Sequence, residues 1–176
     1  MLTDLVLFRH GKAVRPYEAR DDFSRGLTAR GVNEAASQAR RLKAAGFKPD
    51  VVLVSTALRA AQTWDAARPC FPEASVRANR ALYLAAPEIY LSAARDAGAA
   101  RILLIAHDPG LHELARRLMK GDHDTAAGQA ELHAHLPTSG LAWFRRDPRA
   151  QSGFQLHQFW PPTRATDTPQ PDPVDD

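Results

Sequence analysis

The triplet Arg9-His10-Gly11 directly follows the short apolar run Leu5–Phe8 and carries residue types suited to phosphate chemistry. Arginine offers a planar fork of donors to phosphate oxygens, histidine offers a nucleophilic nitrogen, and glycine lets the backbone approach an anion. The same triplet also fits a histidine satisfied by a backbone carbonyl beside an ion-paired surface arginine. The triplet alone therefore leaves a phosphate site and a structural role open.

Two further segments place similar chemistry after apolar runs. Arg59 falls in the first turn of a predicted helix, where its charge opposes the helix dipole unless an anion lies between them. His107 follows the apolar run 101–106 and precedes Pro109-Gly110, and an imidazole there can donate a hydrogen bond to a phosphoryl oxygen. A solvated arginine and a turn-capping histidine are the structural alternatives.

The apolar pattern predicts the elements that must position these groups. Buried strands are expected at 5–8, 50–55 and 101–106, since these runs are short, apolar and lack alternation. Helices are expected at 27–46, 57–68, 87–97 and after Gly110, the first capped by Thr28 and closed by Gly46. Residues 75–79 favour an edge strand, and 141–145 and 154–160 favour two strands joined by a turn.

Alternating strands and helices predict an α/β fold with a largely parallel sheet and helices on both faces. In such sheets the ligand lies beyond the carboxyl ends of the strands. Three of the predicted strand ends carry polar groups, namely Arg9-His10-Gly11, Ser55 with nearby Arg59, and His107. We therefore expect these groups to converge on one anion.

Composition limits the remaining function classes. The 176 residues suit one domain, predicted over 1–160, followed by a disordered Pro/Asp-rich tail over 161–176. The chain has no apolar run long enough to span a membrane, no visible secretory signal and a single cysteine, so we expect a cytoplasmic protein without a membrane role. Its net charge is only +3 and its arginines are scattered, which argues against nucleic-acid binding.

Four ordered motifs resemble the histidine phosphatase (phosphoglycerate mutase-like) superfamily, and most closely its SixA-type phosphohistidine phosphatases. They are Leu7-Phe8-Arg9-His10-Gly11, Arg25-Gly26-Leu27-Thr28-x-x-Gly31, Ser55-x-x-Leu58-Arg59-Ala60-x-Gln62-Thr63 and Ile105-Ala106-His107-Asp108-Pro109-Gly110. The resemblance spans roughly residues 3–145 and implies a three-layer α/β/α sandwich. It also implies a phosphohistidine intermediate on His10, with Arg9, Arg59 and His107 holding the phosphoryl group.

The resemblance implies further roles and contains two departures. Gly11 and Arg25 are additional candidates for substrate binding, and no metal or cofactor is expected. Many relatives carry a glutamate that protonates the leaving group, but no acid stands at that place here, which leaves Glu88 and Asp22 as candidates. Gly26 stands where relatives usually have proline, which puts the rigidity of that loop in question.

Several functions remain open at this point. The expected substrate is a phosphorylated protein, such as a histidine-containing phosphotransfer domain, because so short a chain suggests a shallow, uncovered pocket. A small phosphate ester is the alternative substrate. A non-catalytic module that binds phosphate is a second alternative, and a metal-dependent phosphohydrolase built on His107-Asp108 is a third.

Overall fold

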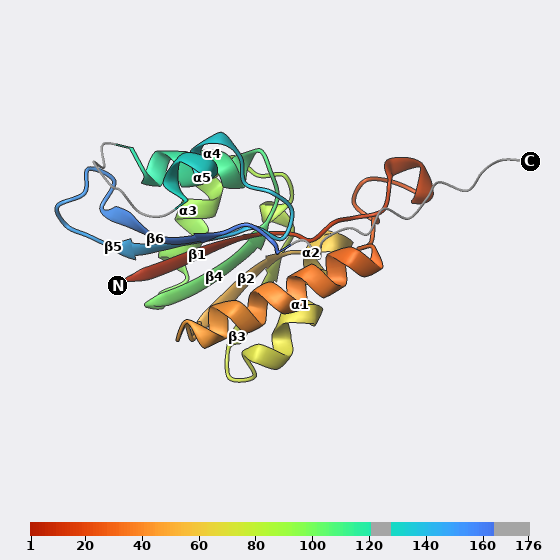
Figure 1. Ribbon diagram of the computed structural model, residues 1–176, viewed down its shortest axis with the longest axis horizontal. Helices are drawn as coiled ribbons and strands as arrows, with labels where there is room; N and C mark the ends of the chain where they lie inside the picture. The colour runs from red at the N-terminus through yellow and green to blue at the C-terminus, as the bar shows by residue number, and fades with distance from the viewer. Residues whose placement is uncertain (121–127, 164–176) are drawn as a thin grey trace, which may run out of the picture.

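The computed structural model describes residues 1–120 and 128–163 (Figure 1). Its centre is a six-stranded sheet in the order β3-β2-β4-β1-β5-β6. The strands are β1 (Asp4–Arg9), β2 (Val51–Ser55), β3 (Ser75–Asn79), β4 (Arg101–Ala106), β5 (Leu141–Arg146) and β6 (Phe154–Trp160). Most of the predicted tail, residues 164–176, lies outside the described residues.

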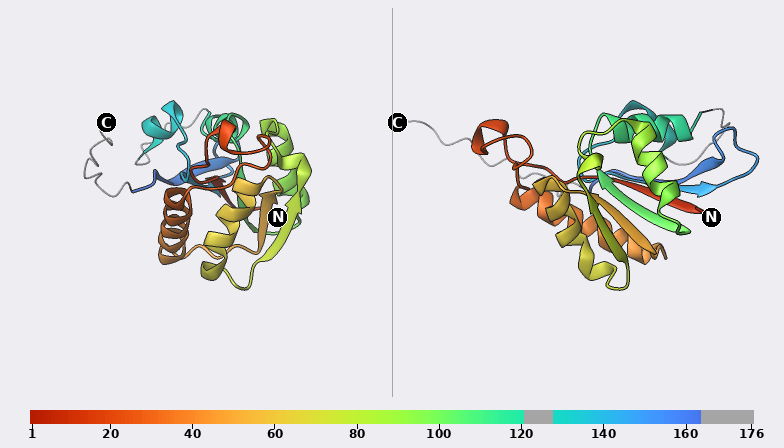
Figure 2. Two further views of the ribbon diagram at one scale, coloured as in Figure 1. Left: turned by 90° about the vertical axis from the view of Figure 1, so that its right-hand side faces the viewer. Right: turned by 180° about the vertical axis from the view of Figure 1, so that it is seen from behind.

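Helices cover both faces of the sheet, which confirms the predicted three-layer α/β/α sandwich. Helices α1 (Ala29–Ala44) and α2 (Leu58–Ala67) lie on one face, and α3 (Pro87–Asp96), α4 (Gly110–Leu118) and α5 (Gln129–Ala134) lie on the other (Figures 1 and 2). Three short 3-10 turns complete the described elements: η1 (Pro16–Glu18), η2 (Arg68–Cys70) and η3 (Arg80–Leu82). None of the helices described is long and apolar enough to span a membrane.

The apolar run of β1 is continuous because both of its faces are buried. Leu5 and Leu7 pack into the core beneath α3 and α4, whereas Val6 and Phe8 pack into the core beneath α1 and α2. All four side chains are fully buried. A strand covered on both sides requires apolar residues at every position, and this is the pattern that the sequence carries.

The sheet is mostly parallel, as predicted, and its exceptions are local. Strands β1, β2, β3 and β4 pair in parallel, while β5 pairs antiparallel with both β1 and β6. The predicted edge strand β3 does lie at the sheet edge. The sequence pattern did not predict α5, a six-residue helix too short to show a helical period.

Candidate active site

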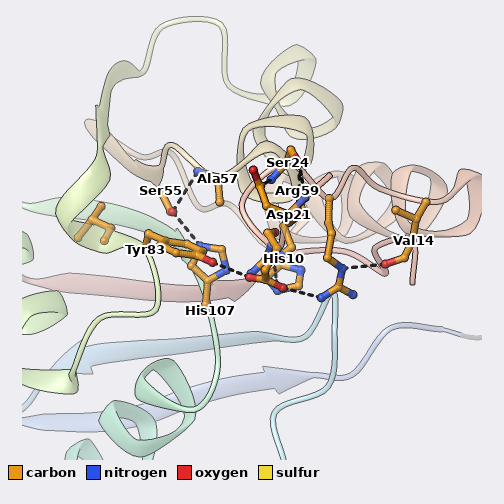
Figure 3. Close-up of polar contacts among 12 residues, drawn as sticks. His10, Val14, Asp21, Ser24, Ser55, Ala57, Arg59, Tyr83 and His107 are labelled. Atoms are coloured by element: carbon orange, nitrogen blue, oxygen red, sulfur yellow. Dashed lines mark hydrogen bonds and ion pairs between the residues drawn. The ribbon is translucent and has the colours of Figure 1, made fainter. Parts of the chain in front are cut away.

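The carboxyl ends of β1, β2 and β4 meet at one edge of the sheet because these strands are parallel neighbours. The imidazole rings of His10 and His107 lie there with their centroids 5.1 Å apart. From α2, Arg59 donates a hydrogen bond from Nε to His10 Nε2 over 3.2 Å. These three side chains, from three distant parts of the sequence, turn toward one another in Figure 3.

His10 is held with one ring nitrogen bonded to the backbone and the other turned toward the pocket. Its Nδ1 lies 2.8 Å from the carbonyl oxygen of Gly11, so Nδ1 carries the proton and donates it. Its Nε2 is then unprotonated and accepts the hydrogen bond from Arg59. This tautomer leaves a lone pair on Nε2, which is what a nucleophilic imidazole requires.

His107 is fully buried and is anchored from the neighbouring strand. Its Nε2 lies 2.8 Å from the hydroxyl oxygen of Ser55, which also accepts a hydrogen bond from the amide of Ala57. Among the described residues, the second ring nitrogen, Nδ1, is buried without a hydrogen-bond partner. Because a buried polar atom is costly to leave unpaired, this nitrogen suits a ligand atom in the pocket.

Both imidazoles are neutral near physiological pH. Burial, reinforced by the nearby guanidinium groups of Arg59 and Arg9, lowers the pKa of His10 to about 3, against an opposing effect of the Gly11 hydrogen bond. Burial likewise lowers the pKa of His107 to about 3, and the charges of its neighbours contribute less. The unfolded chain therefore takes up protons on these residues first, so their contribution to stability is lost as the pH falls from about 6.5 to about 3.

We expect the NMR signals of the His10 and His107 rings to show no titration between about pH 8 and pH 5, because ordinary histidines titrate near pH 6.5 and these two do not charge until far lower. A pH series of imidazole carbon–proton spectra measures this, with assignments from the His10→Gln and His107→Gln variants. An inflection near pH 6.5 in either signal would show that the ring is accessible to protons and would contradict the burial argument.

Arg9 and Arg59 place two guanidinium groups near His10 and His107, close enough for their charges to act on both imidazoles. Arg9 NH1 lies 2.7 Å from the carboxylate of Asp108 and 2.7 Å from the carbonyl of Leu136, whereas its Nε is buried without a partner among the described residues. The Arg59 side chain is only 3% exposed, although it carries a charge at the start of a helix. Such burial of a cation is tolerated only where anions or acceptors surround it.

The anion beside Arg59 in this structure is the carboxylate of Asp22. Arg59 NH2 lies 2.9 Å from Asp22 Oδ2, and Arg59 NH1 donates to the backbone carbonyl of the same residue over 2.5 Å. Arg25, a predicted substrate-binding residue, instead bonds Asp22 Oδ1 over 2.8 Å and the Val14 carbonyl over 2.9 Å. The hydroxyl of Tyr83 donates to Asp22 Oδ2 over 2.6 Å.

Both candidates for a general acid are ionised rather than poised to donate a proton. Hydrogen bonds from Tyr83, Arg25 and Arg59 hold the pKa of Asp22 well below its usual range. Arg117 likewise lowers the pKa of Glu88, with which it forms an ion pair between α4 and α3. A general acid needs a raised pKa, and these surroundings act in the opposite direction.

Gly11 serves close packing rather than the approach of an anion, which differs from the sequence expectation. Its amide donates to the hydroxyl of Thr63 over 3.0 Å, so this donor is already used. A Cβ at position 11 would lie 2.6 Å from the carbonyl oxygen of Gly31 in α1. Glycine is therefore required where the loop after β1 crosses the first turn of α1.

The loop that contains Gly26, whose rigidity the sequence left in question, is held by tertiary hydrogen bonds. Ala13 and Leu27 form an antiparallel bridge, and the amide of Val14 donates to the Gly26 carbonyl. Gln62 in α2 accepts a hydrogen bond from the Leu27 amide over 2.6 Å. These hydrogen bonds restrict the conformation of the loop, as a proline in the loop would.

Sequence reasoning missed three residues that line or support the site. Tyr83 follows η3 and places its ring edge-on to His107, with ring centroids 5.5 Å apart (Figure 3). Asp108 and the Leu136 carbonyl hold Arg9. A single tyrosine in a loop has no sequence pattern that predicts a place beside His107. Asp108, in contrast, belongs to the motif Ile105–Gly110 that resembles the family. Asp108 pairs with Arg9 through Oδ2 and His107 bonds Ser55 through Nε2, so the two neighbouring side chains have different polar partners in this structure.

Comparisons with known proteins agree with this geometry. The sequence profile of the histidine phosphatase superfamily (branch 1) matches residues 5–82. An uncharacterized protein of Picosynechococcus sp. is 31% identical over 150 residues, which cover 81% of this chain and 84% of the relative. A Mycobacterium tuberculosis protein, also uncharacterized, is 32% identical over 78% of this chain and 85% of its own length.

Solved structures give the same result. A candidate phosphohistidine phosphatase SixA from Agrobacterium tumefaciens superposes with a TM-score of 0.78 and 29% identity, covering 92% of this chain and 99% of that one. The protein histidine phosphatase SixA complexed with tungstate gives a TM-score of 0.70 and 26% identity over 89% of this chain and 95% of that one. The chain belongs to the histidine phosphatase superfamily and is a phosphatase similar to SixA.

Proposed function

We propose that this phosphatase removes the phosphoryl group from phosphohistidine on a protein, by way of a phosphohistidine intermediate on its own His10. One observation carries the proposal most strongly: two neutral imidazoles and two guanidinium groups lie close together at the sheet edge, and Arg9 Nε and His107 Nδ1 among them are buried without a partner in the described residues. This donor set matches the three oxygens of a phosphoryl group.

His10 acts as the nucleophile in this proposal. Its Nε2 lone pair attacks phosphorus, and the phosphorus–nitrogen bond of the substrate breaks on the opposite side. In the resting structure that lone pair accepts a hydrogen bond from Arg59, so the Nε–H of Arg59 must exchange its hydrogen-bond acceptor, from His10 to a phosphoryl oxygen, when substrate enters. The guanidinium then moves from stabilising the nucleophile to stabilising the charge of the transition state.

Arg9 and His107 complete the set of donors. The Nε–H of Arg9 is buried without a partner among the described residues and is free to bond a phosphoryl oxygen. The Ser55 hydroxyl accepts from the Ala57 amide and donates its own hydrogen to His107 Nε2, so that His107 Nδ1–H is the group offered to the substrate. Such fixed donors stabilise transferred phosphoryl groups without reorganising during the reaction.

Water completes the reaction at the same phosphorus. The water oxygen forms a new bond to phosphorus while the bond to His10 Nε2 breaks, and its electron pair returns to the nitrogen. Both protons of the water leave on dihydrogen phosphate, so the atoms and charges balance without a further reactant. His10 returns to its neutral form, which the burial of its ring favours.

The surroundings of the pocket support a protein substrate. Leu58 and Leu84 adjoin the pocket residues Arg59 and Tyr83 in sequence and are 40% and 49% exposed, respectively. Leu84 also adopts a left-handed backbone conformation with φ 47°, which is unfavourable for this residue type. Exposed apolar residues beside a reactive group suit contact with another protein surface. The similar SixA was solved as a complex with tungstate, an oxyanion like phosphate.

A substrate panel tests the proposal. We expect kcat/KM for a phosphohistidine-containing phosphotransfer protein to exceed that for free phosphohistidine by at least about tenfold, since only the protein reaches the apolar rim. Common phosphate esters form the third arm, and each arm is run with and without chelator. A higher kcat/KM for a small phosphate ester than for the phosphohistidine protein would show that a small ester is the substrate. Binding without any turnover would contradict the proposal that the protein is a catalyst.

A further inference from the structure

Asp22 places a negative charge beside Arg59, one of the cations that would hold the phosphoryl group. Its side chain is 44% exposed, whereas His10 beneath it is only 9% exposed. Three donors converge on the carboxylate: Tyr83 at 2.6 Å, Arg25 at 2.8 Å and Arg59 at 2.9 Å. These hydrogen bonds hold the carboxylate in one position and keep it ionised.

This charge is unfavourable for phosphate binding taken alone. A phosphoryl group carries negative charge, and Asp22 competes with it for the guanidinium of Arg59. The benefit of a carboxylate at this position must therefore concern another part of the substrate. In an in-line displacement the leaving group lies opposite the nucleophile, and His10 is buried. The leaving group consequently points toward solvent, the side on which Asp22 is exposed and shares Arg59 with His10.

We propose that Asp22 selects the leaving group, favouring a protonated nitrogen such as the imidazolium of phosphohistidine and disfavouring alcohols that carry a carboxylate or a second phosphate. This inference rests on the proposed function and assigns substrate selection to a residue outside the phosphate-holding set. Asp22 accepts the N–H of the distal ring nitrogen of the substrate imidazole. It thereby stabilises the protonated substrate, in which the phosphorus–nitrogen bond is weakest.

The chemistry also explains how this chain reacts without a general acid. When the distal nitrogen of the phosphoimidazole is protonated, attack by His10 Nε2 breaks the phosphorus–nitrogen bond and leaves its electron pair on the departing nitrogen. The imidazole departs neutral, keeping its distal proton, and His10 becomes the phosphorylated, positively charged ring. No proton has to be supplied during the step.

The test compares the Asp22→Asn variant with the wild type on three substrates: free phosphohistidine, 2-phosphoglycolate and p-nitrophenyl phosphate. We expect Asp22→Asn to lower kcat/KM for phosphohistidine about tenfold and to raise it for 2-phosphoglycolate about tenfold, as removal of one partly screened charge implies. The ratio between these two substrates then changes about 100-fold. The p-nitrophenyl group needs no added proton, so that substrate reports the phosphoryl-transfer machinery separately.

Two further variants separate the effect of the Asp22 charge from the effect of disturbing the loop around it. Asp21→Asn changes the adjacent carboxylate, which caps the turn at Ser24 instead of bonding Arg59, and should leave the ratio unchanged. Tyr83→Phe removes one hydrogen bond to Asp22 but keeps its charge, so the ratio should persist. Equal losses on all three substrates in Asp22→Asn would mean that Asp22 only holds Arg59, and would overturn the inference. If the wild type hydrolyses p-nitrophenyl phosphate but neither free phosphohistidine nor a phosphohistidine-containing phosphotransfer protein, the proposed function itself fails.

Discussion

Replacing His10 by alanine is expected to lower kcat/KM by at least about 10⁴-fold, because the variant lacks the nitrogen that we propose attacks phosphorus. The wild type should in turn carry a phosphate that is labile in acid and stable in base after brief exposure to labelled substrate. Rapid quenching followed by peptide mapping places that label, which we expect on the peptide containing His10. The thermal midpoint of each variant shows whether it is folded.

A matched histidine outside the pocket provides the control. His133 lies exposed on α5, so His133→Ala should keep both activity and phosphate labelling. Full turnover by His10→Ala would remove His10 from the mechanism, and label found on His107 instead would exchange the roles of the two imidazoles. The ring centroids are 5.1 Å apart, so the distance between the two imidazoles does not by itself distinguish the nucleophile. The tautomer assigns attack to His10, because Nδ1 donates to the Gly11 carbonyl and Nε2, which accepts a hydrogen bond from Arg59, keeps its lone pair.

Arg59→Ala is expected to produce the second largest effect, a loss of about 10²–10³-fold in kcat/KM. Arg59 contacts the nucleophile through Nε and supplies a buried positive charge where the transition state gains negative charge. Its removal should also weaken the binding of tungstate or vanadate, which calorimetry measures directly. Arg59→Lys should recover part of the anion affinity but little of the rate, because a lysine supplies a charge without the planar fork of donors.

Stability has to be measured alongside activity for this variant. Arg59 also bonds the carbonyl and carboxylate of Asp22, so its loss frees that loop as well as the substrate oxygens. Arg149, which is 89% exposed on the β5–β6 hairpin, gives a matched Arg→Ala control with no expected effect on turnover. Arg59→Ala with wild-type activity and a wild-type melting temperature would exclude Arg59 from the phosphate site.

The elements that position the site were predictable because each carries its own local signal. Thr28 accepts a hydrogen bond from the Gly31 amide at the start of α1, as its residue type and place indicated. Gly46 adopts a φ of 88° just beyond the end of that helix. The uninterrupted apolar residues of β1, β2 and β4 indicated strands covered on both faces, and parallel pairing then placed their polar ends together.

The roles of Gly11 and Asp22 were not predictable in the same way. The sequence favoured a Gly11 backbone open to an anion, but its amide bonds Thr63 and its missing side chain makes room for Gly31. Asp22 was a candidate acid because of its residue type and its place before Arg25. Its three donors come from the same loop, from α2 and from the segment after η3, and together they fix the carboxylate in its ionised form.

The sequence by itself determined the layered α/β fold and the likeness of the four motifs to the family, because hydrophobic periodicity and short motifs are properties of neighbouring residues. Only the tertiary structure decided the protonation states of the side chains in the site. The neutrality of His10 and His107, the tautomer of His10 and the charge of Asp22 depend on burial and on donors contributed by segments distant along the chain. A protonation state is set by all the atoms that surround a group, and those atoms become its neighbours only when the chain folds.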